Sequence, residues 1–423
     1  MHAASLGEAD AQSEGVGSPA PVREYDVVVV GASCAGLFAA EQLASGGRSV
    51  LVGERKRGVG GPARTWIVTD RIREFLGDLP AEVVVHRIGT MAVVSGQKSG
   101  TVALDPPDLI VERSQLLTHL KRRAERAGAV IRNGITFSGV RSEGSRLVVR
   151  FSHRSGEGEH VVTCTHLIGA DGVSSAVAAA VGASPPCTVP IVQARVRLPA
   201  GHDPDRTIVW FERHRTRFFY WLIPESKTHG VLGLVPESPA TARDDLIGFM
   251  KQMDISPVEY QGAMIPLHSP LRRVEYKVGN GRVLLVGDAA AHVKVTTVGG
   301  VVSGVWGALA AARSIERGSS YRKELKGLHR ELYIHDLIRW SLDRFDQPMY
   351  DRLIATLNPE LCRVLSSRSR DSIAGAIAPL LVAQPRILQL GFQALVRPFL
   401  GQTPVARGGT FRRLQPEVSQ AGD

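Results

Sequence analysis

The chain of 423 residues has few cysteines, and no two of them lie close together in sequence. The four are Cys34, Cys164, Cys187 and Cys362, and none has the C-x-x-C spacing that is typical of zinc sites and many iron–sulfur clusters. We therefore expect no bound metal. Free thiols are also typical of a reducing compartment, which predicts a cytoplasmic protein.

Long apolar runs are missing as well. No stretch reaches the roughly 18 apolar residues that a membrane-spanning helix needs. The N-terminal segment consists of small and polar residues, with neither a basic start nor an apolar core, so we expect no secretory signal peptide. We expect residues 1–23 to form a disordered tail.

Lysine is scarce although the chain is basic. Lys and Arg together number 51 against 41 acidic residues, which gives a net charge of +10, yet only 9 of the 51 are Lys. The excess fits either an anionic ligand or a merely Arg-rich composition. No motif that interleaves aromatic and basic residues occurs, so we expect no nucleic-acid partner.

A nucleotide-binding pattern opens the ordered part of the chain. Val27–Val30 is a β-branched run typical of a buried parallel strand, and a turn from Gly31 to Gly36 leads into an apolar helix. Glu54 ends the next strand, 18 residues after Gly36, where an acidic residue binds ribose hydroxyls in such units. Ser33 replaces the middle glycine of G-x-G-x-x-G and is small enough to stay next to a phosphate.

Two further strands each deliver an aspartate at their carboxyl end. One runs into Gly169-Ala170-Asp171-Gly172, and the other runs into Gly287-Asp288-Ala289-Ala290. Ligands of open α/β sheets bind at this end of the strands. Three such segments in this order carry a family resemblance.

The chain resembles the FAD-dependent oxidoreductases of the p-hydroxybenzoate hydroxylase-like superfamily from about Tyr25 to Arg317. The resemblance implies that Glu54, next to Arg55, holds the adenosine ribose. It also implies that Asp171 lies near the pyrophosphate and that Asp288 binds the ribityl hydroxyls. In the segment VERSQLL, Arg113 resembles the arginine that opens a helix and contacts FAD in this family.

Within the superfamily, residues 287–301 are similar to the geranylgeranyl reductase family. That consensus runs G-D-A-A-G-x-v-K-P-T-T-G-G-G-I; here Val295 replaces the proline, and Val298 replaces the first of three glycines. Gly299 and Gly300 remain in front of a helix rich in small residues. Its N–H groups are expected to face the N1–C2=O edge of the flavin and to stabilise the anionic reduced form.

The middle of the chain has the pattern of an antiparallel sheet. Alternate aromatic residues on one of its expected strands, Phe219 and Trp221, point to one face and are candidates for an apolar wall beside the flavin. Packing in the sheet core is an equal alternative. Similar motifs occur in geranylgeranyl reductases and in flavin halogenases. The absence of lysine from residues 58–97 counts against a halogenase.

Two polar residues that follow Asp288 in the sequence, His292 and Lys294, are candidates for functional roles. His292 is a candidate acid or base, with a structural hydrogen bond as the alternative. Lys294 is expected either to contact phosphate or to be solvated.

The expected fold class is α/β: a Rossmann-like FAD-binding domain, an antiparallel substrate domain and a C-terminal helical segment. We assign residues 24–85, 108–186 and 276–320 to the FAD-binding domain and residues 86–107 and 187–275 to the substrate domain. Residues 321–423 form the helical region, which is apolar, basic and broken by prolines. That region either packs on the FAD-binding domain, covers an apolar substrate or makes peripheral contact with an anionic membrane.

The pattern predicts an oxidoreductase that reduces C=C bonds of an isoprenoid or another apolar small molecule with hydride from reduced FAD. NADPH or NADH is the expected electron donor. A monooxygenase or halogenase of an aromatic natural product is the alternative. A third hypothesis is a prenyl-lipid-binding protein without activity. It is based on four departures from the family patterns, at Ser33, Ala176, Val295 and Val298.

Overall fold

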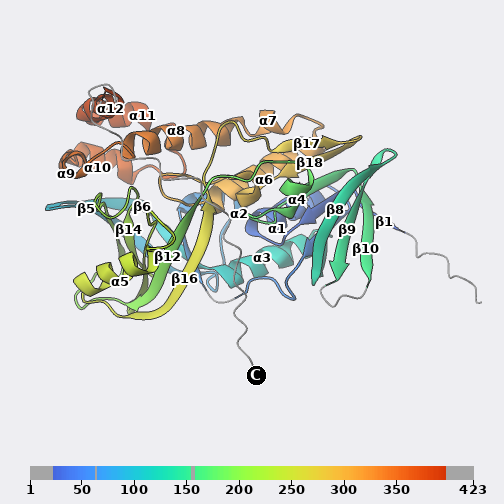
Figure 1. Cartoon of the computed structure of the whole chain (residues 1–423), viewed down its shortest axis with the longest axis horizontal. Helices are drawn as coiled ribbons and strands as arrows, with labels where there is room; N and C mark the ends of the chain where they lie inside the picture. Colours follow the sequence, from blue (N-terminus) through green and yellow to red (C-terminus); the bar gives the residue numbers. More distant parts are fainter. Residues whose placement is uncertain (1–21, 62–63, 154–157, 397–423) are drawn as a thin grey trace, which may run out of the picture.

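The computed structural model describes residues 22–61, 64–153 and 158–396, and its strands form three sheets. In Figure 1 the C-terminal helices run along the top, above the sheets. Most of the predicted tail and the predicted C-terminal region from residue 397 onward lie outside the described residues.

The first sheet has six strands in the order β17-β18-β11-β2-β3-β7. All neighbours are parallel except β17, which is antiparallel to β18. The four valines of β2 are buried, as expected for a central parallel strand without a solvent face. The strands are β2 (Val27–Val30), β3 (Val50–Glu54), β7 (Val130–Asn133), β11 (His166–Gly169), β17 (Glu275–Val278) and β18 (Gly281–Leu285); helix α1 (Cys34–Ser45) contacts both α3 (Arg113–Arg126) and α6 (Val301–Glu316).

A smaller sheet of four strands has the order β1-β10-β9-β8. It lies at the right of Figure 1 and supports the first sheet from that side. Its members and the helix that packs on it are β1 (Arg23–Glu24), β8 (Ile135–Glu143), β9 (Arg146–His153), β10 (Glu159–Cys164) and α4 (Ala176–Ala180).

The third sheet has eight strands in the order β16-β12-β15-β14-β13-β5-β6-β4. Every neighbouring pair is antiparallel except β13 with β5, so the sheet predicted from the middle of the chain is confirmed with one parallel pairing. The members are β4 (Thr65–Val68), β5 (Val84–Ser95), β6 (Lys98–Glu112), β12 (Thr188–Arg197), β13 (Arg206–Trp210), β14 (Tyr220–Pro224), β15 (His229–Leu234) and β16 (Pro257–Pro266); helix α5 (Ala242–Gln252) packs on β12 and β15.

The domain limits stay a prediction. The limits drawn from the sequence assign residues 65–68 and 108–112 to the FAD-binding domain, whereas these residues pair within the eight-stranded sheet. Strands β4 and β6 belong to the eight-stranded sheet although their neighbours in sequence belong to the FAD-binding part, so no local pattern marks a sharp boundary.

The C-terminal helical segment is confirmed. Asp346 and Asn358 cap their helices, each followed by a proline in the first helical turn, where a missing N–H does no harm. No helix of the described part is long and apolar enough to cross a membrane. The remaining elements are η1 (Asp70–Ile72), α2 (Arg73–Leu76), η2 (Gly287–Ala290), α7 (Tyr321–Glu324), α8 (Lys326–Leu342), α9 (Gln347–Ala355), α10 (Pro359–Ser366), α11 (Ile377–Ala383) and α12 (Arg386–Val396).

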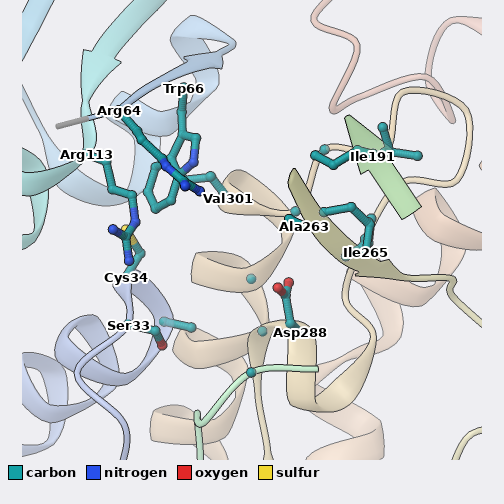
Figure 2. A pocket seen from close by; sticks show the side chains of 18 of the residues that line it. Ser33, Cys34, Arg64, Trp66, Arg113, Ile191, Ala263, Ile265, Asp288 and Val301 are labelled. Atoms are coloured by element: carbon teal, nitrogen blue, oxygen red, sulfur yellow. The ribbon is translucent and has the colours of Figure 1, made fainter. Parts of the chain in front are cut away.

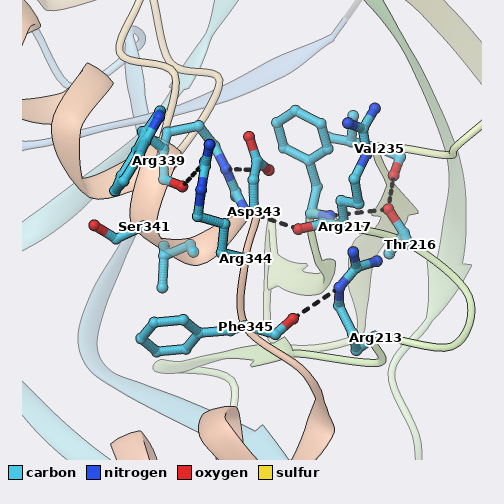
Figure 3. Close-up of polar contacts among 12 residues, drawn as sticks. Arg213, Thr216, Arg217, Val235, Arg339, Ser341, Asp343, Arg344 and Phe345 are labelled. Carbon is cyan, nitrogen blue, oxygen red and sulfur yellow. Dashed lines mark hydrogen bonds and ion pairs between the residues drawn. The ribbon is translucent and has the colours of Figure 1, made fainter. Parts of the chain in front are cut away.

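Arginines tie the helical segment to the eight-stranded sheet (Figure 3). Nη2 of Arg339 on α8 donates a hydrogen bond of 2.8 Å to the carbonyl oxygen of Arg217. In the opposite direction, Nε of Arg213 donates to the carbonyl oxygen of Phe345 at 2.9 Å. Helices α9 and α10 also contact β6. Helix α8 also contacts α6, so the helical segment packs both on the predicted FAD-binding domain, which is one of the three expected alternatives, and on the eight-stranded sheet.

Candidate active site

A cavity of about 790 Å³ lies between the carboxyl ends of the parallel strands and one face of the eight-stranded sheet. Figure 2 shows Ser33, Arg113 and Asp288 around one part of it, and Ile191 and Ile265 of the sheet on the other side. Its lining contains all but one of the predicted cofactor-binding residues, together with both aromatic candidates: Gly31, Ser33, Glu54, Arg55, Arg113, Asp171, Phe219, Trp221, Gly287, Asp288, Gly299 and Gly300.

The turn between β2 and α1 approaches its neighbours too closely for side chains. Gly31 has a φ of +102°, and a Cβ there would lie 2.5 Å from the carbonyl oxygen of Ala170. Gly36 is the predicted residue that does not line the cavity; a Cβ on it would lie 2.2 Å from the carbonyl oxygen of Gly31. The two glycines therefore let helix α1 begin directly at the end of the sheet, with its N-terminus towards the cavity.

Ser33 caps helix α1. Its Oγ accepts a hydrogen bond of 3.2 Å from the N–H of Gly36, so the serine turns back towards its own helix. The departure from glycine at this position is therefore compatible with the turn.

Glu54 is held over the same turn. Its Oε2 accepts a hydrogen bond of 2.8 Å from the N–H of Ala32, and its Oε1 accepts one of 2.9 Å from the N–H of Lys56. The neighbouring Arg55 also lines the cavity and is exposed. The carboxylate is thereby fixed at the carboxyl end of β3, next to the N-terminus of α1.

Basic and aromatic side chains form the adjoining wall. The guanidinium of Arg113 lies 5.4 Å from the ring centre of Trp66 and donates to the carbonyl oxygen of Gly60. Arg64 lines the cavity beside them, and its buried Nε has no hydrogen-bond partner among the described residues. Burial raises the pKa of the Cys34 thiol to about 12, so this residue is no thiolate. Sequence reasoning missed Trp66, which belongs to no motif.

Asp171 and Asp288 differ in their surroundings. The Asp171 carboxylate accepts a 2.5 Å hydrogen bond from Oγ of Ser175 and a 3.1 Å bond from the N–H of Val177, so it fixes the start of α4. Asp288 is half-buried at the cavity, and its carboxylate has no hydrogen bond to any described residue. Burial alone raises the pKa of Asp288. A half-buried acceptor that faces a cavity without a partner is suited to a ligand with hydroxyl donors.

The loop before helix α6 brings a strained residue into the cavity. Val298 has a φ of +48°, a conformation that β-branched residues rarely adopt. Its side chain packs against the cluster that contains Phe219 and Trp221. Gly299 and Gly300 follow, and a Cβ on Gly300 would lie 3.2 Å from Oδ1 of Asp288, so this pair stands beside that carboxylate.

Phe219 and Trp221 lie side by side in the cavity wall. Their ring centres are 5.8 Å apart, and both side chains are less than 10% exposed. Each has an apolar surface facing the cavity, while Tyr220 between them points into the other core of the sheet.

His292 and Lys294 stand apart from this cavity. His292 does not line it; the ring packs against Gly307 of α6 and lies 6.5 Å from the ring of His329, and burial holds the pKa of His292 well below its ordinary value. The position gives no support to an acid or base role. Lys294 was expected to meet phosphate or solvent, but its Nζ lies 2.6 Å from a carboxylate oxygen of Asp371 in a buried ion pair.

Several lining residues come from positions that no motif marks. Arg370 reaches the cavity from the C-terminal segment and pairs with Asp108, and Gln193 and Gln261 reach it from β12 and β16. Only the long-range pairing of the chain places them there. No cluster of side chains suited to a metal occurs among the described residues.

Comparisons with known proteins agree with this geometry. Residues 24–316 match the model of the FAD binding domain family. The chain is 31% identical over 295 residues to digeranylgeranylglycerophospholipid reductase 2 of Methanothermobacter thermautotrophicus, covering 66% of this chain and 74% of that protein. It is 27% identical over 348 residues to the chloroplastic geranylgeranyl diphosphate reductase of Oryza sativa subsp. japonica, covering 75% of this chain and 73% of that protein.

Solved structures show the same fold. A geranylgeranyl bacteriochlorophyll reductase-like protein from Thermoplasma acidophilum superposes with a TM-score of 0.74 at 16% identity, over 88% of this chain and all of that one. A flavin-dependent brominase superposes with a TM-score of 0.64 at 18% identity, over 89% of this chain and all of that one.

The residues present fit FAD. Glycines occupy the turn where a Cβ would collide, a helix N-terminus faces the cavity, and the half-buried Asp288 carboxylate needs a donor. The chain therefore belongs to the FAD binding domain family and is an FAD-dependent oxidoreductase similar to the geranylgeranyl reductases.

Proposed function

We propose that this protein reduces C=C bonds of an isoprenoid or a similarly apolar small molecule. The observation that carries the proposal is the apolar wall of the cavity, which continues directly from the loop that holds Gly299 and Gly300. Phe219, Trp221 and Val298 belong to one packed cluster there. A wall of this kind excludes water and binds a hydrocarbon chain by burying its surface.

The cofactor roles follow the resemblance and the positions of the side chains. The N-terminus of α1 would bind the pyrophosphate, Glu54 the adenosine ribose, and Asp288 the ribityl hydroxyls. Asp171 holds the loop before α4 in place near the pyrophosphate. Arg113 would contact the cofactor from the start of α3.

The flavin edge would lie against Gly299 and Gly300. FAD, when bound and reduced, supplies the hydride. The chain orients the substrate, and the N–H groups at the start of α6 stabilise negative charge at that place. NADPH or NADH is the proposed electron donor. Cytoplasmic location is part of the same proposal.

The reductase is preferred to the alternative drawn from the sequence, a monooxygenase or halogenase. The relatives with 26–31% identity are named as reductases of geranylgeranyl compounds. The likeness to the brominase, at 18% identity, concerns the fold.

Product analysis tests the proposal. Purified protein with its flavin is incubated without oxygen with NADPH or NADH and a geranylgeranyl lipid, and the lipid is analysed by mass spectrometry. We expect a gain of two hydrogens for each reduced double bond, and a much lower rate in Trp221→Ala, with Trp210→Ala on the opposite face of the sheet as the matched control. An unchanged lipid together with an oxygen-dependent product from an aromatic substrate would contradict it.

A further inference from the structure

A row of directly paired residues crosses the face of the eight-stranded sheet that forms the cavity wall. Val209 on β13 pairs with Trp221 on β14, and Trp221 pairs with Gly233 on β15. Gly233 pairs with Gln193 on β12, which pairs with Gln261 on β16. Apart from Gly233, all of these residues line the cavity. The row is therefore apolar at one end and ends in two side-chain amides.

The indole of Trp221 extends along this row towards the amides. A Cβ on Gly233 would lie 2.4 Å from a carbon of the indole and 2.7 Å from Cβ of Gln193. Only a residue without a side chain leaves room for the ring at that position. The indole therefore lies across β15, with Gln193 beyond it.

The two glutamines bond to one another and leave polar atoms over. Nε2 of Gln193 donates a hydrogen bond of 3.0 Å to Oε1 of Gln261. Gln261 is only 9% exposed. Oε1 of Gln193 and Nε2 of Gln261 form no hydrogen bond with any described residue. One acceptor and one donor group are thus left at the cavity.

The amide pair has apolar neighbours on one side along the strands, and on the other side it has the charged residues Arg195 and Glu259, which do not line the cavity. Two residues along each strand, on the same face, stand Ile191 and Ala263, and both line the cavity. A ligand that fills the cavity removes water from these two atoms, which is unfavourable unless the ligand itself bonds to them. The cluster of Phe219 and Trp221 needs no amide for its packing. The pair is therefore suited to a polar group on a ligand that is apolar elsewhere.

We propose that Gln193 and Gln261 bind a hydroxyl group of the substrate, which makes an isoprenoid alcohol the substrate class of this site. The inference rests on the proposed function and deepens it. A hydroxyl can donate to Oε1 of Gln193 and accept from Nε2 of Gln261, and so uses both remaining atoms. An amide pair carries no net charge, so it does not compensate a phosphate or a carboxylate.

The geometry also places the hydroxyl relative to the aromatic wall. The backbones of Gln193 and Trp221 stand on strands separated by β15, hence about 10 Å apart at a strand spacing of about 4.8 Å, and the indole extends across this gap. An isoprenoid alcohol that bonds to the amides would lay its nearest carbons along the indole.

Binding measurements with two probes test the proposal. The probes are geranylgeraniol and the same chain with hydrogen in place of the hydroxyl, and binding is followed by the absorbance change of oxidised flavin, which requires no turnover. We expect wild type to bind the alcohol about tenfold more tightly than the hydrocarbon, a factor typical of hydrogen bonds in a buried site. The Gln193→Leu/Gln261→Leu double variant should lose this preference and keep its affinity for the hydrocarbon. Gln252→Leu, at an exposed position on α5, is the matched control.

The possible outcomes distinguish a failure of the amide proposal from a failure of the proposed function. Equal binding of both probes by wild type, or no binding of either, overturns the amide proposal without reference to any variant. Equal loss of both probes in the double variant assigns the pair a purely structural role and also overturns it. If wild type prefers the alcohol but never reduces it, the amide proposal stands and the proposed function fails. Steady-state measurements add that KM for the alcohol, and not kcat, should change in the double variant.

Discussion

The buried ion pair between Lys294 and Asp371 should be among the most sensitive points of this structure. Lys294 begins the loop that carries Val298, and its side chain is 9% exposed, while that of Asp371 is 3% exposed. The two charged atoms are 2.6 Å apart, and the second oxygen of Asp371 accepts a 2.6 Å hydrogen bond from Thr69. The pair links the C-terminal segment to the wall of the cavity.

Lys294→Met should remove one partner and leave the other charge buried. Breaking a buried pair in this way costs about 3–5 kcal/mol, because the remaining ion has lost both water and its counter-charge. Replacing both partners with apolar residues of similar size is often nearly neutral. We therefore expect Lys294→Met to lower the free energy of unfolding by about 3–5 kcal/mol at pH 7, and the Lys294→Met/Asp371→Leu double variant to recover most of the loss.

Acidification should reduce the difference in the free energy of unfolding between wild type and Lys294→Met. Burial raises the pKa of Asp371, but the ammonium of Lys294 and the hydroxyl of Thr69 more than offset this and hold the pKa below its ordinary value. In wild type the stabilisation is present above the unfolded pKa of about 3.9 and is lost as pH falls through the folded value. In Lys294→Met only Thr69 and the charge of Arg370 still oppose the effect of burial, so Asp371 should take up a proton at higher pH than in wild type, and the loss of stability should shrink from pH 7 to pH 5.

Guanidinium denaturation followed by tryptophan fluorescence measures these differences. Two results would refute the reasoning: a loss of less than about 1 kcal/mol in Lys294→Met at pH 7, or a double variant as unstable as the single one. A loss that does not change between pH 7 and pH 5 would refute the part assigned to Asp371.

Three further predictions concern single side chains. Gly36→Ala should weaken FAD binding at least tenfold in a fluorescence titration, because the new Cβ would lie 2.2 Å from the carbonyl oxygen of Gly31. Gly58→Ala is the control, since a Cβ there would have no neighbour within 4 Å, and it should leave FAD binding unchanged. Equal effects of the two variants would contradict this prediction. Val298→Gly should be about 1 kcal/mol more stable than Val298→Ala, since only glycine relieves the positive φ; the opposite order in thermal melts would disprove the strain. Burial lowers the pKa of His335 to about 4, so this residue stays neutral in the folded protein while the unfolded chain takes up a proton near pH 6.5. The free energy of unfolding should therefore fall between about pH 6.5 and pH 4, by up to about 1.4 kcal/mol per pH unit from this group. His335→Gln should flatten that slope in denaturation measured across this pH range, and an unchanged slope would count against the assignment.

The cofactor end of the cavity could be predicted because its determinants are local in sequence. A buried strand, a turn that tolerates only glycine and a helix start follow one another within a dozen residues around Gly31 and Gly36. Asp288 comes directly after a strand that the valine and leucine run already marks. In each case backbone geometry allows few residue types, so the sequence carries the signal.

The substrate end could not be predicted in the same way. Gln193 and Gln261 meet through the pairing of β12 with β16, and Arg370 arrives from a segment far along the chain. Lys294 found its partner in Asp371, 77 residues further on, by burial and not by a local pattern. Side chains that meet through tertiary packing leave no periodicity in the sequence. The domain limits are blurred for the same reason, because residues 65–68 and 108–112 join the eight-stranded sheet by long-range pairing.

The most direct test of the account is the fate of electrons in the reduced protein. Protein with its flavin fully reduced by dithionite is mixed in a stopped-flow instrument with a geranylgeranyl lipid under nitrogen, and in a parallel experiment with oxygen alone. We expect the lipid to reoxidise the flavin without oxygen, with one C=C bond reduced for each flavin that is oxidised. A flavin that stays reduced with the lipid, but reacts with oxygen and transfers an oxygen atom or a halogen to an aromatic compound, would contradict it.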